Sequence, residues 1–283
     1  MSFEITRIKD LTDKEFKIIS QYIEKNVGIK MPSSKRLMMQ SRLTSRMKAL
    51  NISNFSDYID FVFNTDSNGE ELVGMIDALT TNKTDFFREA DHFRYLYNTV
   101  LPQFYAEGQK EVRLWSAACS SGEEVYTLGM VMQEYIDRNP YTISDYHIIG
   151  SDISTKVLKK AMDCVYPLDS IDIVPLEMKK KYFLKSKDSL RQTVRVKKEL
   201  RDKASFLRLN FLDDVYSCIK GSFDVIFCRN ALIYFDRANQ EAVIRKLLGF
   251  LRKGGYLFLG HSETILGMDL PLKTVAPTVY CKE

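Results

Sequence analysis

From about residue 110 onward, short apolar runs alternate with helical patterns, and this alternation limits the fold more than any other feature of the chain. Strands that return to one sheet through a helix run parallel, with right-handed crossovers. The pattern therefore predicts an α/β fold with a mostly parallel sheet. The predicted strands are residues 112–117, 146–151, 204–209, 223–228 and 256–260, and the predicted helices are residues 122–137, 154–163 and 237–251.

Two segments fall outside this alternation. Residues 164–203 include the basic, strand-like sequence RQTVRVKKEL, which predicts a small inserted β-subdomain. The C-terminal sequence PLKTVAPTVYCKE predicts a hairpin strand at one edge of the sheet.

The first 75 residues show helical periodicity only. Thr12 or Asp13 is expected to begin a helix that Gly28 ends, because glycine readily takes the left-handed conformation after a last turn. Further helices are expected from about residues 33, 53 and 70. The predicted organisation is a helical domain at 1–75, a linker region at 76–110 and an α/β domain at 111–283.

Composition argues against several classes of protein. The net charge of +4 over 283 residues is too small to indicate nucleic-acid binding. The five cysteines contain no C-x-x-C pair, and the three histidines lack metal-ligand spacing, so neither a disulfide framework nor a metal site is expected. No apolar stretch is long enough to span a membrane, and the N-terminus does not resemble a signal peptide. We therefore expect a cytoplasmic monomer that does not insert into membranes.

The sequence FDVIFCRNALIY, residues 223–234, is a buried strand that runs directly into polar residues. Ligands of α/β proteins bind where parallel strands end at their carboxyl edge. Arg229, Asn230 and Tyr234 follow this strand and are either a loop reaching water or part of a site. The strand at 112–117 also ends in a polar cluster, ACSSGEE, which favours a site.

That second cluster is a strand-to-helix turn in which Gly122 is the only glycine. Small residues let a ligand approach the backbone, and the helix offers free N–H groups. Glu123 and Glu124 would repel a phosphate, so the turn suits a positively charged group, such as an ammonium or a sulfonium. The alternative is that both glutamates only complement the helix dipole.

Three further residues at strand ends are candidate ligand contacts. Asp152 can hold ribose hydroxyls or cap the helix that begins near Ser154. Asn210 and Phe211 suit the edge and the face of an adenine ring, although this pair alone is weak evidence.

Two segments before the sheet contain candidate binding residues. The sequence TTNKTDFFREADHF, at 80–93, joins the helical region to the sheet, where clefts form, although Arg88 is equally an ordinary surface arginine. On the helix from Ser34, the side chains of Lys35, Arg42 and Arg46 fall within about 20° of one face. That basic face is either solvated or a docking surface for an acidic partner.

Taken in order, NKTDFFRE, WSAACSSGEE, GSD, the strand-ending Asn210, FCRNALIYF and LFLGHSE closely resemble the CheR family of bacterial chemotaxis receptor methyltransferases. The resemblance spans nearly the whole chain, and the ordered set is far more specific than any single motif. It implies methyl transfer from S-adenosylmethionine to glutamate side chains on chemoreceptor helices, leaving S-adenosylhomocysteine. It also implies an all-α N-terminal domain followed by a Rossmann-like methyltransferase sheet with a small β-subdomain.

The resemblance implies roles for individual residues. Arg88 and Tyr234 would act on the substrate carboxylate, and the basic helix near Arg42 and Arg46 would face the acidic methylation region of the receptor. The cofactor contacts would be Asn82, Thr84, Arg88, Glu124, Asp152, Asn210, Phe211, Arg229 and Asn230.

This chemistry needs no general base. A glutamate carboxylate, with a pKa of about 4.3, is ionised at pH 7 and is itself the nucleophile. Alignment, partial desolvation and attraction to the sulfonium are sufficient.

Two rival functions remain open. Many methyltransferases that act on nitrogen carry an N-P-P-Y-like motif, whereas Asn230 is followed here by Ala-Leu-Ile-Tyr. The second rival is a catalytically silent S-adenosylmethionine-binding scaffold or sensor, against which Arg88 and Tyr234 together argue.

The chain departs from some family members in the inserted subdomain. Those members hold a receptor C-terminal peptide next to a glycine-rich loop, whereas the corresponding loop here, KSKDSLRQT at 185–193, has no glycine. Tethering by such a peptide is therefore in doubt.

Overall fold

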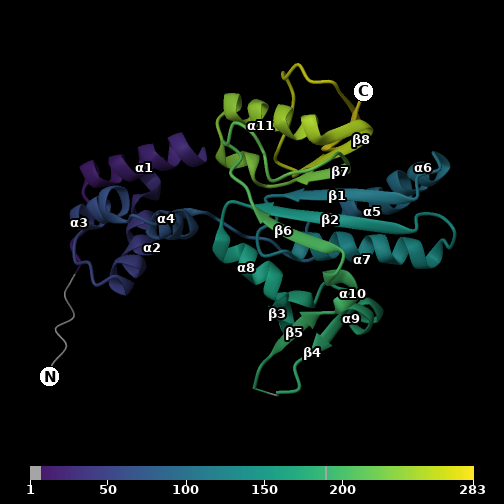
Figure 1. Cartoon of the computed structure of the whole chain (residues 1–283), viewed down its shortest axis with the longest axis horizontal. Coiled ribbons are helices and arrows are strands. Elements are labelled where there is room, and N and C mark those ends of the chain that lie inside the picture. Colours follow the sequence, from purple (N-terminus) through teal and green to yellow (C-terminus); the bar gives the residue numbers. More distant parts are fainter. Residues whose placement is uncertain (1–7, 189) are drawn as a thin grey trace. The chain divides into compact units, whose positions relative to one another are not determined.

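The computed structural model describes residues 8–188 and 190–283, which form two compact units. One unit extends to Thr81 and also includes Tyr234–Asp236. The other comprises Asn82–Ile233 and Arg237–Glu283. Figure 1 labels the helices and strands of both.

The first unit is entirely helical, as predicted. Thr12 begins its first helix with a capping box, in which Thr12 and Glu15 each bond the other's backbone N–H. Gly28 ends that helix with a φ of 80°, in the left-handed region. The elements of this first unit are α1 (Asp13–Val27), the 3₁₀ turn η1 (Ser33–Lys35), α2 (Arg36–Ala49), α3 (Phe55–Asp60), the π-helical η2 (Phe61–Thr65) and α4 (Glu70–Leu79).

Apolar side chains at helical spacing form the core of this unit. They include Ile19 and Ile23 on α1 and Met39, Leu43 and Met47 on α2, each at most 1% exposed. Burying one such side chain stabilises a fold by about 1.5–3 kcal/mol, so this core outweighs the exposed polar contacts around it.

The basic face expected on α2 is largely engaged within its own unit. Arg42 Nη1 donates to the carbonyl oxygens of residues 78, 79 and 80, which end α4. Arg46 forms an ion pair with the buried carboxylate of Glu71, which also accepts the Tyr58 hydroxyl at 2.7 Å. Lys35 lies in η1 rather than on α2 and donates to the carbonyl of Lys30 at 2.9 Å. The interpretation of Arg42 and Arg46 as part of a simple solvated face is therefore wrong, because helix-end carbonyls and a buried carboxylate accept from them.

The second unit contains the predicted α/β sheet, with seven strands in the order β6-β2-β1-β7-β8-β10-β9. The pairs β6–β2, β2–β1, β1–β7 and β7–β8 are parallel, whereas β10 is antiparallel to β8 and β9. The strands are β1 (Glu111–Ala117), β2 (Asp145–Asp152), β6 (Ala204–Arg208), β7 (Phe223–Cys228), β8 (Leu251–Leu259), β9 (Leu272–Ala276) and β10 (Val279–Lys282).

Helices cover both faces of this sheet. On one face, Leu114 of β1 belongs to a core built with α7 and with the segment before β1. On the other face, the Trp115 ring lies 5.8 Å from Phe250 of α11. Figure 1 shows α7 and α8 on one side of the strands and α11 on the other. The helical elements are α5 (Ala90–Tyr95), η3 (Leu96–Val100), α6 (Leu101–Ala106), α7 (Glu123–Arg138), α8 (Thr155–Asp163), η5 (Leu232–Tyr234) and α11 (Arg237–Phe250).

A second, smaller sheet is inserted between β2 and β6. Its strands are antiparallel in the order β3-β5-β4, which confirms the expected β-subdomain of the fold. Phe86, which precedes the large sheet, packs edge-on against Tyr166 and Phe183 of this subdomain at 5.1 and 5.5 Å. The elements are β3 (Val165–Pro167), η4 (Leu168–Ile171), α9 (Leu176–Tyr182), β4 (Phe183–Lys185), β5 (Thr193–Val196) and α10 (Lys198–Arg201).

One strand begins earlier than its apolar run suggested. β8 starts at Leu251, which pairs with Phe223, rather than at residue 256. Arg252, Lys253 and two glycines occupy the intervening positions and conceal the strand in the sequence. Arg252 is paired with the buried Asp224 carboxylate at 2.6 Å, so this polar segment belongs to the sheet.

Replacing Arg46 by alanine should loosen the helical unit. Glu71 is 4% exposed and would retain a carboxylate without its cationic partner. We expect α4 to lose about 1–3 kcal/mol of stability, less than for a fully buried pair because Arg46 itself is 39% exposed. Native-state hydrogen exchange of the α4 amides measures this, with Lys48→Ala on the exposed side of α2 as the control. Equal exchange in the two variants would contradict the prediction.

Candidate functional site

Strand register brings several of the predicted site residues to one edge of the sheet. Ala117, the last residue of β1, pairs with Ser151 of β2 and with Cys228 of β7. The residues that follow, in the turn 118–122, at Asp152 and at Arg229, are therefore neighbours at the carboxyl edge. This is the place where open α/β sheets bind ligands.

The turn after β1 is tightly constrained. Ala118, Ser120 and Gly122 all have positive φ angles, of 66°, 50° and 93°. A Cβ atom on Gly122 would lie 2.8 Å from the Cβ of Ala161, so only glycine fits there. Ser120 Oγ donates to the Asn82 carbonyl at 2.8 Å, which fixes the turn against the segment before α5.

Asp152 performs a structural task at this edge. Its Oδ2 accepts the Ser120 N–H and its Oδ1 accepts the Ser154 N–H, each at 2.9 Å. The cap of α8 is Ser154, whose hydroxyl accepts from Val157, so the alternative of Asp152 as the helix cap is wrong. Asp152 is 7% exposed and braces the turn between β1 and α7.

Glu124 and Arg229 form a buried ion pair. Arg229 Nε donates to Glu124 Oε2 at 2.9 Å, and Ser116 Oγ donates to the other oxygen at 2.6 Å. The Arg229 side chain is 2% exposed and that of Glu124 is 11% exposed, so both charges need these partners. The expected alternative for Glu124, that it only complements the helix dipole, does not account for this pairing.

The remaining Arg229 nitrogens are also engaged. Nη2 donates to the Arg88 carbonyl at 2.6 Å, and Nη1 lies 3.0 Å from His92 Nδ1. The guanidinium carbon lies 5.2 and 5.6 Å from the ring centroids of Phe93 and Phe227. Aromatic faces and polar acceptors thus surround the charge together.

His92 is neutral in this environment. Burial and then the Arg229 charge lower the pKa of His92 to about 4. Thr278 Oγ1 donates to the Pro277 carbonyl, so it can only accept from His92 Nε2, 2.9 Å away. The proton of His92 is therefore on Nε2, and its Nδ1 lone pair accepts from Arg229.

Glu89 and Glu263 hold the loop that follows β7. Glu263 is 5% exposed, and its carboxylate accepts backbone N–H groups of Asn230, Leu232 and Gly260. Asn230, with a φ of 57°, donates its side-chain amide to Glu89 Oε1 at 3.0 Å. Burial opposes ionisation of Glu89, but the Asn230 hydrogen bond and the Arg229 charge hold the pKa of Glu89 below its usual value.

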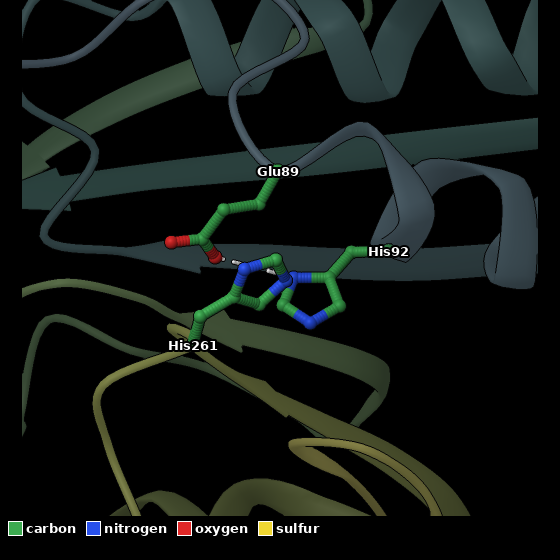
Figure 2. A group of neighbouring side chains, drawn as sticks. All are labelled: Glu89, His92 and His261. Carbon is green, nitrogen blue, oxygen red and sulfur yellow. Dashed lines mark ion pairs between the residues drawn. The ribbon is translucent and has the colours of Figure 1, made fainter.

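Glu89, His92 and His261 lie close enough to hold a metal ion, with ligand-type atoms within 4.8 Å of one another (Figure 2). However, His92 Nδ1 already accepts from Arg229, whose Nη1 is also 3.8 Å from Glu89 Oε2. A metal ion between these atoms would face the guanidinium charge at close range. The guanidinium is the cation of this cluster.

The other predicted residues are placed as follows. Arg88 donates to the Lys83 carbonyl at 2.8 Å, while Asn82 and Thr84 are partly exposed in the same segment. Asn210 Oδ1 accepts the Leu212 N–H at 3.0 Å, and Phe211 is 8% exposed. The structure thus brings Arg88, Glu124, Arg229 and Asn230 together through shared partners.

Tyr234 groups with the helical unit. Its carbonyl accepts the Lys30 N–H at 2.9 Å, and the Lys35 ammonium lies 5.6 Å from its ring centroid. The action of the Tyr234 hydroxyl on a substrate carboxylate stays a prediction.

Sequence reasoning missed Ser116, Glu89, His92 and Glu263. Glu89 and His92 are spaced like neighbours on one helix turn, and Glu263 follows the end of β8, so spacing and strand ends were the available signals. His92 contacts Arg229 across 137 positions of the chain and Glu89 bonds Asn230 across 141, and no local pattern reveals such pairs.

Two family models match this chain. Residues 14–80 match the CheR methyltransferase all-alpha domain, and residues 82–281 match the CheR methyltransferase SAM-binding domain. A chemotaxis protein methyltransferase of Borreliella burgdorferi is 37% identical over 277 residues, covering 96% of this chain and 95% of that protein. Those of Salmonella typhimurium and Escherichia coli are each 34% identical, covering 98% of this chain and 93% of theirs.

No helix in the described residues is long and apolar enough to cross a membrane.

The two family matches together span both structural units, and the identity extends over nearly the full length of each relative. The chain therefore belongs to the CheR family and is an S-adenosylmethionine-dependent chemotaxis protein methyltransferase.

Proposed function

We propose that the edge formed by Asn82, Glu124, Asp152 and Arg229 binds S-adenosylmethionine and presents its methyl group to glutamate side chains of chemoreceptors. The observation that supports this proposal is the buried Glu124 carboxylate, which accepts hydrogen bonds from Arg229 and Ser116. Two hydrogen bonds leave further lone pairs on its oxygens, so Glu124 can also accept from the ammonium group of the cofactor.

The other cofactor contacts are proposed at the same edge. Asp152 would accept from the ribose hydroxyls, and Asn210 and Phe211 would contact the adenine. Asn82, Thr84 and Arg88 come from the segment that the Ser120 and Arg229 bonds hold in place. The Arg229 guanidinium is already engaged on three nitrogens. Arg229 and Asn230 would therefore contribute to cofactor binding through their backbone atoms and by positioning the residues beside them.

The residues present suit direct transfer. When bound, S-adenosylmethionine supplies an electrophilic methyl group on a sulfonium. An ionised carboxylate oxygen forms the new bond to that carbon while the carbon–sulfur bond breaks and sulfur keeps the electron pair. No proton moves, so no general base is needed. His92, which is buried at this edge, has both ring nitrogens engaged, which agrees with such a reaction.

Arg88 and Tyr234 are the residues we propose to orient the acceptor carboxylate. A guanidinium can hold both oxygens of a carboxylate in one plane, which supplies the alignment the reaction needs.

Glu124→Gln should weaken binding of S-adenosylhomocysteine, which retains the ammonium group. Loss of the carboxylate charge should raise the Kd by roughly 10–100-fold, as for other charged hydrogen-bond partners. Calorimetry measures this, and circular dichroism checks folding. Glu123→Gln is the matched control, because Glu123 is also buried but bonds Ser121. Equal affinities in the two variants would refute the assignment of Glu124.

Arg88→Ala should reduce receptor methylation by at least about 100-fold, because the acceptor loses its orienting cation. Transfer of labelled methyl to receptor, released as methanol in mild base, measures ester formation. Arg88→Lys should recover part of the rate, since it keeps the charge but not the planar fork. Arg94→Ala, at an exposed arginine of α5, should retain the rate. Normal turnover in Arg88→Ala would show that another group orients the carboxylate, and base-stable label would indicate a nitrogen acceptor.

We also propose that Lys35, Arg42 and Arg46 help the helical unit attract the acidic methylation region of the receptor. Arg46 forms an ion pair with Glu71, whereas Arg42 Nη1 donates to backbone carbonyl oxygens, which carry no net charge. The positive charge of Arg42 is retained in these bonds and can act at a distance.

The KM for receptor should rise as salt increases from about 50 to 200 mM, because screening shortens the reach of exposed charges. Arg42→Gln should show a smaller rise than the wild type, while the Kd for S-adenosylhomocysteine stays unchanged. Arg46→Gln is the comparison, because it removes a charge that is already paired with Glu71. The salt dependence of its KM should differ less from that of the wild type. A salt dependence that is the same in all three proteins would exclude this face from receptor recognition.

A further inference from the structure

We propose that His92 is a positioning residue for the methyl-transfer site and acts by orienting the Arg229 guanidinium that holds Glu124. His92 is 1% exposed, and its ring nitrogens contact Thr278 and Arg229. This inference rests on the proposed function of Glu124 as the partner of the cofactor ammonium group.

The direction of each hydrogen bond in this chain follows from the chemistry of its members. Thr278 gives its hydroxyl hydrogen to the Pro277 carbonyl at 2.8 Å, so it accepts from His92 Nε2. The unprotonated Nδ1 then faces Arg229 Nη1, which can only donate. Arg229 therefore donates to His92, and His92 donates to Thr278. Reversing either hydrogen bond would leave a buried donor without an acceptor.

Arg229 has planar geometry, so fixing one nitrogen fixes the others. With Nη1 on His92, the guanidinium plane directs Nε to Glu124 Oε2 and Nη2 to the Arg88 carbonyl. Phe93 and Phe227 limit movement out of this plane, because their ring centroids lie 5.2 and 5.6 Å from the guanidinium carbon. His92 therefore determines the direction from which Glu124 is held.

The carbonyl bond extends the effect of His92 to the segment that carries Arg88. Phe87 and Glu89, on either side of Arg88, have left-handed φ angles of 53° and 54°. Non-glycine residues keep such angles only when their surroundings hold them. The Arg229 bond to the carbonyl between them is one such restraint.

Figure 2 shows the His92 and His261 rings beside the Glu89 carboxylate. His261 Nε2 contacts the exposed Asp91 at 3.0 Å, so it is turned toward a different partner. Of the two histidines, only His92 bonds the guanidinium, and His92 alone is tested below.

Three substitutions separate positioning from packing. Asparagine has its amide oxygen at the same number of bonds from the backbone as Nδ1, so His92→Asn keeps an acceptor for Arg229. His92→Gln places its amide nearer Nε2 and loses that acceptor, and His92→Phe loses both contacts. A packing role would favour phenylalanine and glutamine, which are closer to histidine in size than asparagine is.

We expect the Kd for S-adenosylhomocysteine, measured by calorimetry, to rise about tenfold in His92→Phe and His92→Gln and about twofold or less in His92→Asn. His147→Phe is the matched control on β2, where the histidine bonds Ser205 away from this edge, and it should bind normally. If His92→Asn instead bound S-adenosylhomocysteine most weakly of the three variants, His92 would only fill space, and the proposal would be overturned.

A double-mutant cycle tests the route through Glu124. In a Glu124→Gln background, His92→Phe should change the Kd less than about twofold, because the carboxylate it helps to orient is gone. A further tenfold loss in that background would mean that His92 acts independently and would overturn the inference. If Glu124→Gln alone leaves the Kd unchanged, the proposed ammonium site is wrong. If Glu124→Gln weakens binding but His92→Phe does not, only the inference about His92 is wrong.

Discussion

The buried charge of Arg229 is the constraint on which the rest of the site depends. A guanidinium removed from water must find acceptors, or the fold loses several kcal/mol. It has three acceptors: Glu124 in the first turn of α7, His92 in α5 and the Arg88 carbonyl just before α5. One side chain at the end of β7 thereby connects the segment preceding the sheet to the turn that follows β1.

The backbone at this edge is strained in several places, and polar side chains hold it. Positive φ angles occur at Glu89 and Asn230, which bond each other through their side chains. Glu263 stabilises the Asn230 conformation by accepting three backbone N–H groups of the surrounding loops. Such strain is characteristic of functional sites, where a less favourable backbone shape is retained because it places atoms for binding. The carboxylates here are therefore structural supports as well as the ligand contacts we propose.

A reaction without a general base explains how this site uses its polar residues. Methyl transfer to an ionised carboxylate depends on alignment, so buried groups serve orientation rather than proton movement. The buried histidine that contacts Arg229, His92, is neutral and has both ring nitrogens engaged. The same cluster that resembles a metal site in its residue types is occupied by an arginine instead.

The sequence by itself determined the fold class, the approximate bounds of the main strands and helices of the large sheet, and the residues at the strand ends. Apolar periodicity is local information, and the residues that end β1 and β7 follow directly from it. The extension of β8 was hidden by its charged residues and glycines, and Lys35, Arg42 and Arg46 formed a face in the sequence whose contacts only the structure supplied. Only the tertiary structure decided which polar side chains pair, because Arg229 meets Glu124 across 105 positions and His92 across 137. Such pairings depend on strand order and on burial, and neither property is encoded in the spacing of neighbouring residues.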